Sequence, residues 1–196
     1  MTTPATSRDR AKAERTDAIL REAARLFAER GYNGVSLEDI GAAVGVSGPA
    51  VYRHFAGKQA LLGAVLVQVS EDLVSGGTRV AAADSAERSM RALIEFHVGF
   101  ALGHADVIRV HDREVAQLAA GDHAEVRRLQ RAYIDLWMET LAPLVDADAD
   151  ELRLRVQACF GLINSTPHST RAASRGRSAT ATVLVAMAES ALRAST

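Results

Sequence analysis

The sequence is poor in the features that define several large classes of protein. Its 196 residues contain a single cysteine, Cys159, which excludes an internal disulfide framework and a cysteine-rich zinc site. No apolar run approaches the roughly 18 residues of a membrane-spanning helix, and the polar first 15 residues lack the apolar core of a secretory signal. We therefore expect a cytoplasmic protein with no membrane partner.

Motifs for catalysis and an excess of charge are also missing. The chain has no G-x-S-x-G sequence, no P-loop and no paired metal-binding motif, so we expect no enzyme activity, no catalytic residue, no cofactor and no metal. The net charge is −1, so the whole chain is not a basic polyanion binder. Between residues 45 and 60, however, Arg53 and Lys58 occur without any acidic residue. Nucleic-acid binding needs such a local patch rather than a high overall charge.

Apolar residues recur at helical rather than strand spacing along nearly the whole chain, which predicts an all-α fold. The segment 75–87, which contains Gly76 and Gly77, is interpreted as a looser connection. We expect helices over about 12–30, 36–44, 48–55, 58–73, 86–103, 105–119, 122–144, 148–165 and 177–194.

Two of these helices, with the short turn between them, have the pattern of a helix-turn-helix. Ser36 is the expected N-cap of the first, with Asp39 completing a capping box. Gly45 permits the tight turn because it tolerates positive φ. Ser47 is expected to cap the second helix with its side chain, and Pro49 suits the first turn. The alternative is a plain helical hairpin with a solvated face, but the capping, turn and packing signals agree on a helix-turn-helix.

The second helix of such a unit inserts its N-terminal end into the DNA major groove. Val51 and Phe55 are one turn apart and are predicted to pack inward, which leaves small and polar residues facing out. Ala50 is expected to touch a thymine methyl, while Tyr52 and Lys58 are expected to hold phosphates. For His54 two roles stay open: packing beside Phe55 or touching a phosphate. The expected DNA-binding residues are Ser36, Ser47, Gly48, Pro49, Ala50, Tyr52, Arg53, His54 and Lys58.

At this point the sequence resembles the TetR family of bacterial transcriptional regulators over about residues 12–72. Gly41 and Val44 depart from the pattern, since the family usually has alanine at both. The residues that carry the resemblance are Gly31, Tyr32, Ser36, Ile40, Gly45, Val46, Ser47, Tyr52, His54, Phe55, Lys58 and Leu61.

The resemblance implies an N-terminal three-helix DNA-binding domain followed by a helical bundle that binds a small molecule and forms a homodimer. It implies a repressor released by its ligand from a palindromic double-stranded DNA operator, although an activator stays open. We expect a flexible polar arm at 1–11, a DNA-binding domain at 12–58 with the helix-turn-helix at 35–54, and a ligand-binding and dimerisation domain at 59–196.

The expected helices at 148–165 and 177–194 have apolar arcs wider than one core face needs. Two such helices from each subunit would form a four-helix dimer interface. The alternative is that both helices are simply buried in the core of a monomer.

Aromatic side chains in the same region are candidates for a ligand pocket inside the bundle. Aromatic pairs four residues apart on one helix are also typical of an ordinary core. Asn164, at the end of an apolar helix, would either orient a ligand or cap the helix. The expected ligand-binding residues are Phe96, Phe100, Tyr133, Trp137, Phe160 and Asn164.

The chemistry of the ligand stays open at this stage. Arg109, Arg113, Arg127, Arg128 and Arg131 would suit a phosphate-bearing ligand such as an acyl-coenzyme A, or they form a solvated face with ion pairs. A neutral lipophilic ligand is the main competitor. His97, His104 and His111 recur every seven residues, and isolated histidines are preferred over a metal site. Two further alternatives are a DNA-binding dimer without a ligand and a helical enzyme.

Overall fold

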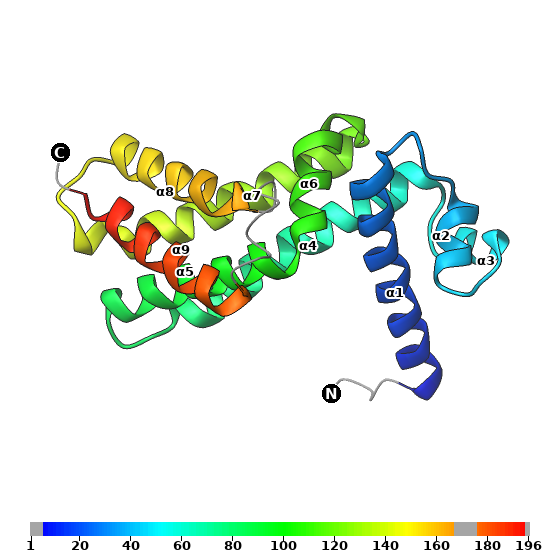
Figure 1. The fold of residues 1–196 in the computed structure, drawn as a ribbon, viewed down its shortest axis with the longest axis horizontal. Coiled ribbons are helices and arrows are strands. Elements are labelled where there is room, and N and C mark those ends of the chain that lie inside the picture. Colours follow the sequence, from blue (N-terminus) through cyan, green and yellow to red (C-terminus); the bar gives the residue numbers. More distant parts are fainter. Residues whose placement is uncertain (1–5, 167–175, 195–196) are drawn as a thin grey trace.

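The computed structural model describes residues 6–166 and 176–194. Within these ranges every regular element is helical, which confirms the all-α fold (Figure 1). In chain order the elements are α1 (Ser7–Arg30), α2 (Leu37–Ala43), α3 (Gly48–Tyr52), α4 (Lys58–Ala81), α5 (Ala86–Gly103), α6 (Ala105–Glu114), the 3₁₀ turn η1 (Val115–Gln117), α7 (Ala120–Leu141), the 3₁₀ turn η2 (Ala142–Leu144), α8 (Ala149–Asn164) and α9 (Arg177–Leu192).

Helix α1 begins at Ser7, earlier than the start near residue 12 that we expected. Thr6 is its N-cap, and the Thr6 hydroxyl accepts a hydrogen bond from the Asp9 N–H at 3.2 Å. The Asp9 carboxylate in turn accepts from the Thr6 N–H at 3.1 Å. This capping box satisfies the first free N–H groups of the helix, so the part of the predicted polar arm from Ser7 onward is helical. Residues 1–5 of that arm lie outside the described residues.

Helix α4 continues to Ala81, and the prediction of a looser connection from residue 75 is wrong for its first seven residues. Gly76 and Gly77 lie inside the helix because other helices pack close to it there. A Cβ atom on Gly76 would overlap the ring of Phe96, and one on Gly77 would lie 2.6 Å from Cε2 of Tyr133. The two glycines therefore allow α5 and α7 to approach α4, rather than breaking it.

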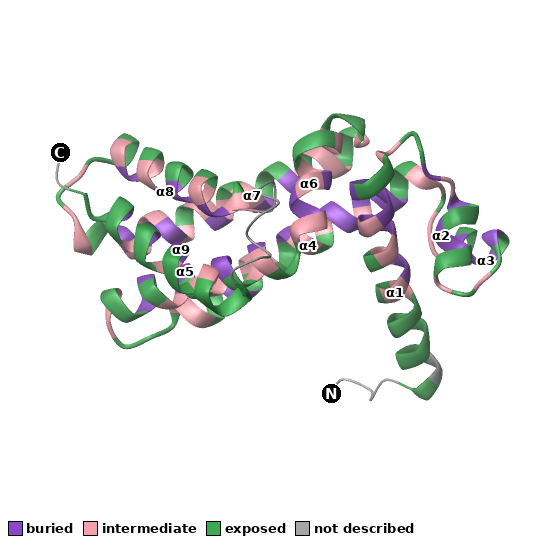
Figure 2. Ribbon diagram, in the orientation of Figure 1, coloured by how far each residue is buried: buried purple, intermediate pink, exposed green. Residues whose placement is uncertain are grey.

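Helix α4 is shared by two hydrophobic cores (Figure 2). The first core joins α1, α2 and α3 to the N-terminal half of α4, and it also includes Val107 and Val110 from α6 and Val126 from α7. The second core is formed mainly by α5, α7, α8 and α9. The N-terminal helices therefore do not pack alone, because α6 and α7 contribute to their core.

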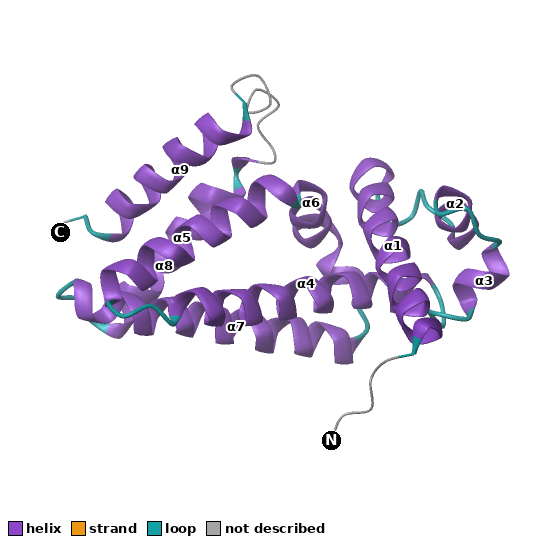
Figure 3. Cartoon of the chain, turned by 90° about the horizontal axis from the view of Figure 1, so that it is seen from below, coloured by secondary structure: helices purple, strands orange, loops and turns teal. Residues whose placement is uncertain are grey.

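By length and composition α4 is apolar enough to cross a membrane. In this fold, however, α7 runs alongside it, and α1, α5 and α6 also pack against it (Figure 3). Three of its leucines, Leu61, Leu62 and Leu66, are fully buried. The composition of α4 is thus that of a central core helix.

We predict that the close packing at Gly77 makes it intolerant of a side chain. Gly77→Ala places a methyl group against the buried Tyr133 ring and should lower the free energy of unfolding by about 1–3 kcal/mol. The control is Gly99→Ala in α5, where a Cβ meets nothing within 4 Å; alanine's better helix propensity should make that variant about 0.5–1 kcal/mol more stable. Urea unfolding measures both, and a Gly77→Ala protein as stable as the parent would contradict the packing argument.

Candidate functional site

The helix-turn-helix forms around the caps and turn that the sequence indicates. The Ser36 hydroxyl accepts from the Asp39 N–H at 3.0 Å, and the Asp39 carboxylate accepts from the Ser36 N–H at 2.8 Å. Hydrogen bonds from Ser36, its side chain first, lower the pKa of Asp39 below its usual range. Gly45 has a φ of 70°, and the next amide, Val46 N–H, donates to the Gly41 carbonyl at 2.9 Å. The tight turn and the N-cap of α2 are thus confirmed.

Gly41 lies where α2 and α3 approach most closely. A Cβ atom there would stand 3.0 Å from the carbonyl oxygen of Val46 and 3.3 Å from the Gly48 nitrogen. Glycine at position 41, where alanine is the expected residue, therefore allows close packing of the two helices.

The short helix α3 presents only part of the surface that we expected. Ser47, Pro49 and Arg53 are exposed, and Tyr52 is 54% exposed. Gly48 and Ala50, by contrast, are buried, so the expectation that they face outward is wrong.

The first turn of α3 packs against α2, which explains this burial. A Cβ atom on Gly48 would lie 3.1 Å from Cγ of Glu38. The side-chain cap expected from Ser47 is also absent, because the Ala50 N–H donates to the backbone carbonyl of Ser47 instead, at 2.9 Å.

Lys58 binds the protein's own backbone rather than facing outward for a phosphate. Its Nζ donates to the carbonyl oxygens of Tyr32 at 2.9 Å and Val35 at 3.0 Å. The same ammonium group stands 4.4 Å from the centroid of the Tyr32 ring, a cation–π distance. Lys58 therefore attaches α4 to the loop that follows α1, and its expected contact with a phosphate stays a prediction.

We define the α1–α2 junction as residues 27–35. Helix α6 also hydrogen-bonds to this junction, and the sequence did not indicate that contact. Nη2 of Arg113 donates to the carbonyl oxygens of Phe27 at 3.0 Å and Ala28 at 2.7 Å. The neighbouring Glu114 carboxylate accepts from the Tyr32 N–H at 3.0 Å. Helices α4 and α6 therefore both hydrogen-bond to the junction that positions α2 and α3.

His54 is half-buried and contacts α1. Its Nδ1 lies 3.0 Å from the hydroxyl of Thr16, and its ring centroid lies 6.3 Å from that of Phe55. His54 therefore packs against α1 and beside Phe55, and its contact with a phosphate stays a prediction.

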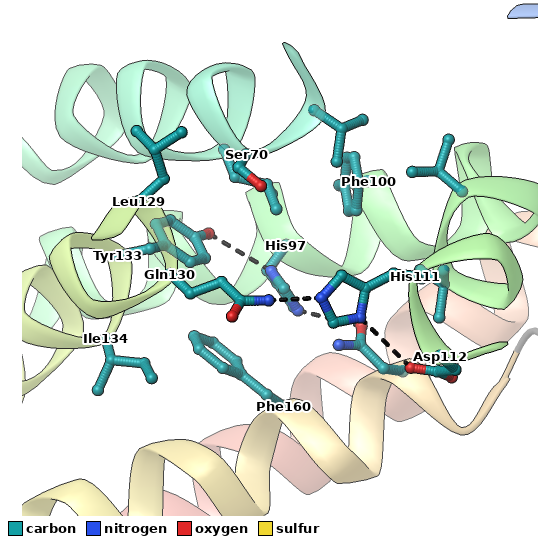
Figure 4. Close-up of a pocket in the computed structure, with 15 residues that line it drawn as sticks. Ser70, His97, Phe100, His111, Asp112, Leu129, Gln130, Tyr133, Ile134 and Phe160 are labelled. Atoms are coloured by element: carbon teal, nitrogen blue, oxygen red, sulfur yellow. Dashed lines mark hydrogen bonds and ion pairs between the residues drawn. The ribbon is translucent and has the colours of Figure 1, made fainter. Parts of the chain in front are cut away.

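A cavity of about 300 Å³ lies among α4, α5, α6, α7 and α8 (Figure 4). It is lined mainly by apolar and aromatic side chains, with a few polar groups, as ligand pockets are. The lining residues are Val69, Ser70, Leu73, His97, Phe100, Val107, Ile108, His111, Asp112, Leu129, Gln130, Tyr133, Ile134, Phe160 and Asn164.

Four of the six expected ligand-binding residues line this cavity: Phe100, Tyr133, Phe160 and Asn164. Phe96 does not, because its ring packs on Gly76 and lines an open groove outside the bundle. Trp137 is fully buried behind the lining, with its ring centroid 4.9 Å from that of Phe160 in an edge-to-face contact.

His97 lies in the cavity wall and links two of the expected residues. Its Nε2 is 3.2 Å from Oδ1 of Asn164, and its Nδ1 is 3.4 Å from the Tyr133 hydroxyl (Figure 4). Its ring stacks on Phe160 at a centroid distance of 4.6 Å. Burial lowers the pKa of His97 to about 4, against a weaker opposing effect of the Asn164 hydrogen bond, so the imidazole is uncharged at neutral pH. In the sequence, the seven-residue spacing marks His97, His104 and His111 equally, so it does not single out His97.

The second polar group of the cavity comes from α6 and α7. Nε2 of Gln130 lies 2.5 Å from Nε2 of His111, whose Nδ1 is 3.6 Å from the Asp112 carboxylate (Figure 4). His104 lies at the break between α5 and α6 and stacks on Phe100. Among the residues the structure describes, no group of three or more histidine, cysteine or acidic side chains is placed to share a metal.

None of the five arginines considered as phosphate ligands lines the cavity. Arg113 is bound to the α1–α2 junction. Arg109 pairs with Asp106 at 3.1 Å and Arg128 with Glu125 at 2.6 Å on the outer surface.

These features define a helix-turn-helix DNA-binding protein with a mainly apolar cavity among the helices of its C-terminal part. The family model described as "Bacterial regulatory proteins, tetR family" matches residues 19–65. The model described as "Tetracyclin repressor-like, C-terminal domain" matches residues 82–193. The chain therefore belongs to the TetR family of transcriptional regulators, as residues 12–72 indicate.

Known relatives resemble the chain over most of its length. It is 30% identical to the HTH-type transcriptional repressor Rv3405c of Mycobacterium tuberculosis, covering 79% of this chain and 93% of that protein. It is 25% identical to the HTH-type transcriptional repressor KstR2 of Rhodococcus jostii, covering 85% and 82%. The solved structure of the transcriptional regulator FadR from Bacillus subtilis in complex with stearoyl-CoA has the same fold, with a TM-score of 0.67, 19% identity and coverage of 90% and 95%.

We predict that Lys58 and the exposed Arg53 differ in how they affect DNA binding. Lys58→Met should lower the free energy of unfolding by about 1–3 kcal/mol, because two buried carbonyls lose a charged donor. It should weaken DNA binding without changing the slope of log affinity against log salt. Arg53→Met should reduce that slope by about 1, as expected for a lost phosphate contact.

The measurement is a salt titration of binding to the DNA upstream of the protein's own coding region, with urea unfolding alongside it. A reduced salt slope for Lys58→Met, equal to that of Arg53→Met, would mean that Lys58 contacts phosphate after all.

Proposed function

We propose that this regulator is a repressor that binds a palindromic operator as a homodimer and is released when a small molecule enters the cavity. One observation carries the proposal: α4 and α6 each line the cavity and each hydrogen-bond to the α1–α2 junction. A ligand that changes the spacing of these helices also changes the placement of α3. The two relatives named as repressors, Rv3405c and KstR2, support the direction of the response.

The surface proposed to meet DNA is the exposed side of α3. Ser47, Pro49, Tyr52 and Arg53 are accessible there, and a helix-turn-helix places this end in the major groove. In a dimer the two α3 helices would stand about 34–36 Å apart, one turn of the duplex.

The other expected DNA-binding residues, Ser36, Gly48, Ala50, His54 and Lys58, act in this proposal by fixing the position of α3. We place the DNA-binding domain at 12–58 and the ligand-binding and dimerisation domain at 59–196, with α1 extending the former to Ser7.

The proposed dimer interface is the outer face of α8 and α9. On α9 the exposed residues between Ala179 and Ala191 are all uncharged, and they include Val183 and Met187, at 47% and 49% exposure. On α8 the exposed Leu154, at 65%, belongs to a similar uncharged face. The opposite side of α9 packs into its own bundle, so the wide apolar arc of this helix serves both surfaces in a four-helix interface.

The proposed effector is a small lipophilic molecule. The volume of about 300 Å³ is at the lower end for ligand pockets, and most of the lining is apolar. The second candidate is an acyl-coenzyme A thioester, which the complex of FadR with stearoyl-CoA supports. In that case the acyl group would occupy the cavity and the coenzyme A would lie outside it.

The role proposed here is binding rather than catalysis, in the cytoplasm where the DNA is. The thiol of Cys159 does not line the cavity, and burial raises its pKa to about 12. A thiol of this kind is a poor nucleophile at neutral pH.

We predict that a charge on the outer face of α9 prevents dimerisation. Met187→Glu would bury an unpaired carboxylate in the proposed interface, so the variant should be monomeric and should lose operator binding at concentrations where the parent is dimeric. Thr78→Glu, at an exposed position of α4, is the control and should remain dimeric. Sedimentation equilibrium measures the dimer dissociation constant of each protein. A Met187→Glu dimer as tight as the parent's would mean that the interface lies elsewhere.

We predict that an effector that binds in the cavity causes the protein to release DNA. Neutral lipophilic compounds and acyl-coenzyme A thioesters are titrated into the protein–DNA complex, with the emission of Trp137, the single tryptophan, reporting occupancy of the adjacent cavity. An effector should weaken DNA binding by about 5–150-fold, the range of typical allosteric coupling.

A cavity-filling variant and a matched control test where the effector acts. Ile108→Phe should bind DNA but lose the response, because Ile108 lines the cavity. Phe96→Leu, outside the cavity, should respond as the parent does. If no compound of either class alters DNA binding, or if Ile108→Phe responds fully, the proposed sensor role is wrong.

A further inference from the structure

The described lining of the cavity offers a ligand no lysine or arginine side chain. Among residues 6–166 and 176–194, no lysine or arginine lines it, and its only acidic residue is Asp112, whose side chain is 51% exposed. His97 is uncharged for the reason given above. A carboxylate or phosphate inside would thus lose its hydration without gaining a lysine or arginine partner.

The hydrogen bonds around His97 leave one amide unused. Because the carbonyl oxygen of Asn164 can only accept, Nε2 of His97 carries the ring proton and donates to it. Nδ1 of His97 then accepts from the Tyr133 hydroxyl. These two hydrogen bonds engage the hydroxyl proton of Tyr133 and the side-chain oxygen of Asn164. The side-chain NH₂ of Asn164 has no partner among the described residues, and Asn164 lines the cavity.

The other polar groups at the cavity have internal partners. The hydroxyl of Ser70 donates to the Leu66 carbonyl within α4 at 2.8 Å. Gln130 and His111 lie within hydrogen-bond distance of each other. Gln130 thus keeps at most one amide proton for a ligand, whereas neither amide proton of Asn164 is engaged among the described residues.

Aromatic rings adjoin this donor and would surround a flat apolar body. The ring of Phe160 stacks on His97 and on Tyr133, with the latter centroids 5.5 Å apart. Aliphatic side chains, including Leu73, Ile108 and Leu129, complete the lining. The cavity thus places the free amide of Asn164 beside a mainly apolar and aromatic wall.

We propose that the cavity selects an uncharged lipophilic molecule with a carbonyl-type oxygen, which accepts a hydrogen bond from the Asn164 side-chain amide. This inference rests on the proposed function, since it defines the ligand class of the same cavity. Such a cavity would bind neutral ketones and esters more tightly than free acids of the same size.

The experiment compares three probes of nearly equal shape: 2-acetylnaphthalene, a ketone; 2-isopropenylnaphthalene, in which a CH₂ group replaces the ketone oxygen; and 2-naphthoate, an anion. Dissociation constants are measured on the full chain by Trp137 fluorescence and calorimetry. The ketone should bind about fivefold more tightly than the hydrocarbon, the effect of one hydrogen bond. The anion should bind roughly tenfold or more weakly than the ketone.

Two variants locate the preference at Asn164. In Asn164→Leu the ketone and the hydrocarbon should bind equally. Asn164→Asp, which keeps an oxygen for His97 but loses the amide N–H, should also lose the preference, so the test holds even if Asn164→Leu folds poorly. Ser70→Ala removes a hydroxyl from the same cavity without removing a donor for the ligand, and it should keep the fivefold preference.

Equal binding of ketone and hydrocarbon to the parent, binding of 2-naphthoate as tight as the ketone, or failure of the ketone to bind would each overturn the inference. None of these results bears on whether another ligand releases DNA, because that is decided separately by DNA release and the Ile108→Phe variant. A protein that responds to an anionic thioester but rejects the neutral ketone would therefore retain the proposed function and lose this inference.

Discussion

The position of the DNA-binding helix depends on how the α1–α2 junction is held. The carbonyl groups at the end of α1 can accept further hydrogen bonds, and the guanidinium of Arg113 donates to two of them, those of Phe27 and Ala28. Cationic groups are favoured at this end of a helix because of its dipole. Lys58 binds two carbonyls further along, and Glu114 accepts the N–H of Tyr32 between them. Replacing these partners with water would require the junction to open, so α2 and α3 are oriented by contacts from α4 and α6.

This arrangement connects the cavity to the proposed DNA-binding surface of α3. Helix α6 has only ten residues, and it carries cavity-lining Ile108 and His111 one turn before Arg113 and Glu114. A displacement of its cavity face therefore also moves the residues that hold the junction. Val107 and Val110 of the same helix belong to the core beneath α1. The N-terminal helices and the bundle share packing, so a ligand that distinguishes two positions of α6 also distinguishes two positions of α3.

The sequence predicts those features that depend on neighbouring residues. The N-cap at Ser36, the turn at Gly45 and the limits of several helices follow from local rules, and they agree with the structure. Features that depend on distant residues were not predictable in this way. Lys58 looked like a phosphate ligand because nothing local showed that the carbonyls of Tyr32 and Val35 would meet it. Gly76 and Gly77 looked like a break because the rings that pack on them come from α5 and α7.

The helix-turn-helix and the cavity differ in how far neighbouring residues determine them. The residues that carry the helix-turn-helix pattern lie close together in the sequence, because its caps and turn form between near neighbours. The cavity lining comes from five helices and has no local motif, so its chemistry follows only from their packing. His97 illustrates the difference. On one helix it is an unremarkable histidine, but between Tyr133 and Asn164 both of its nitrogens are satisfied without a ligand. The side-chain NH₂ of Asn164, by contrast, has no partner among the described residues, so the selectivity proposed for the cavity depends on what a ligand offers to that group.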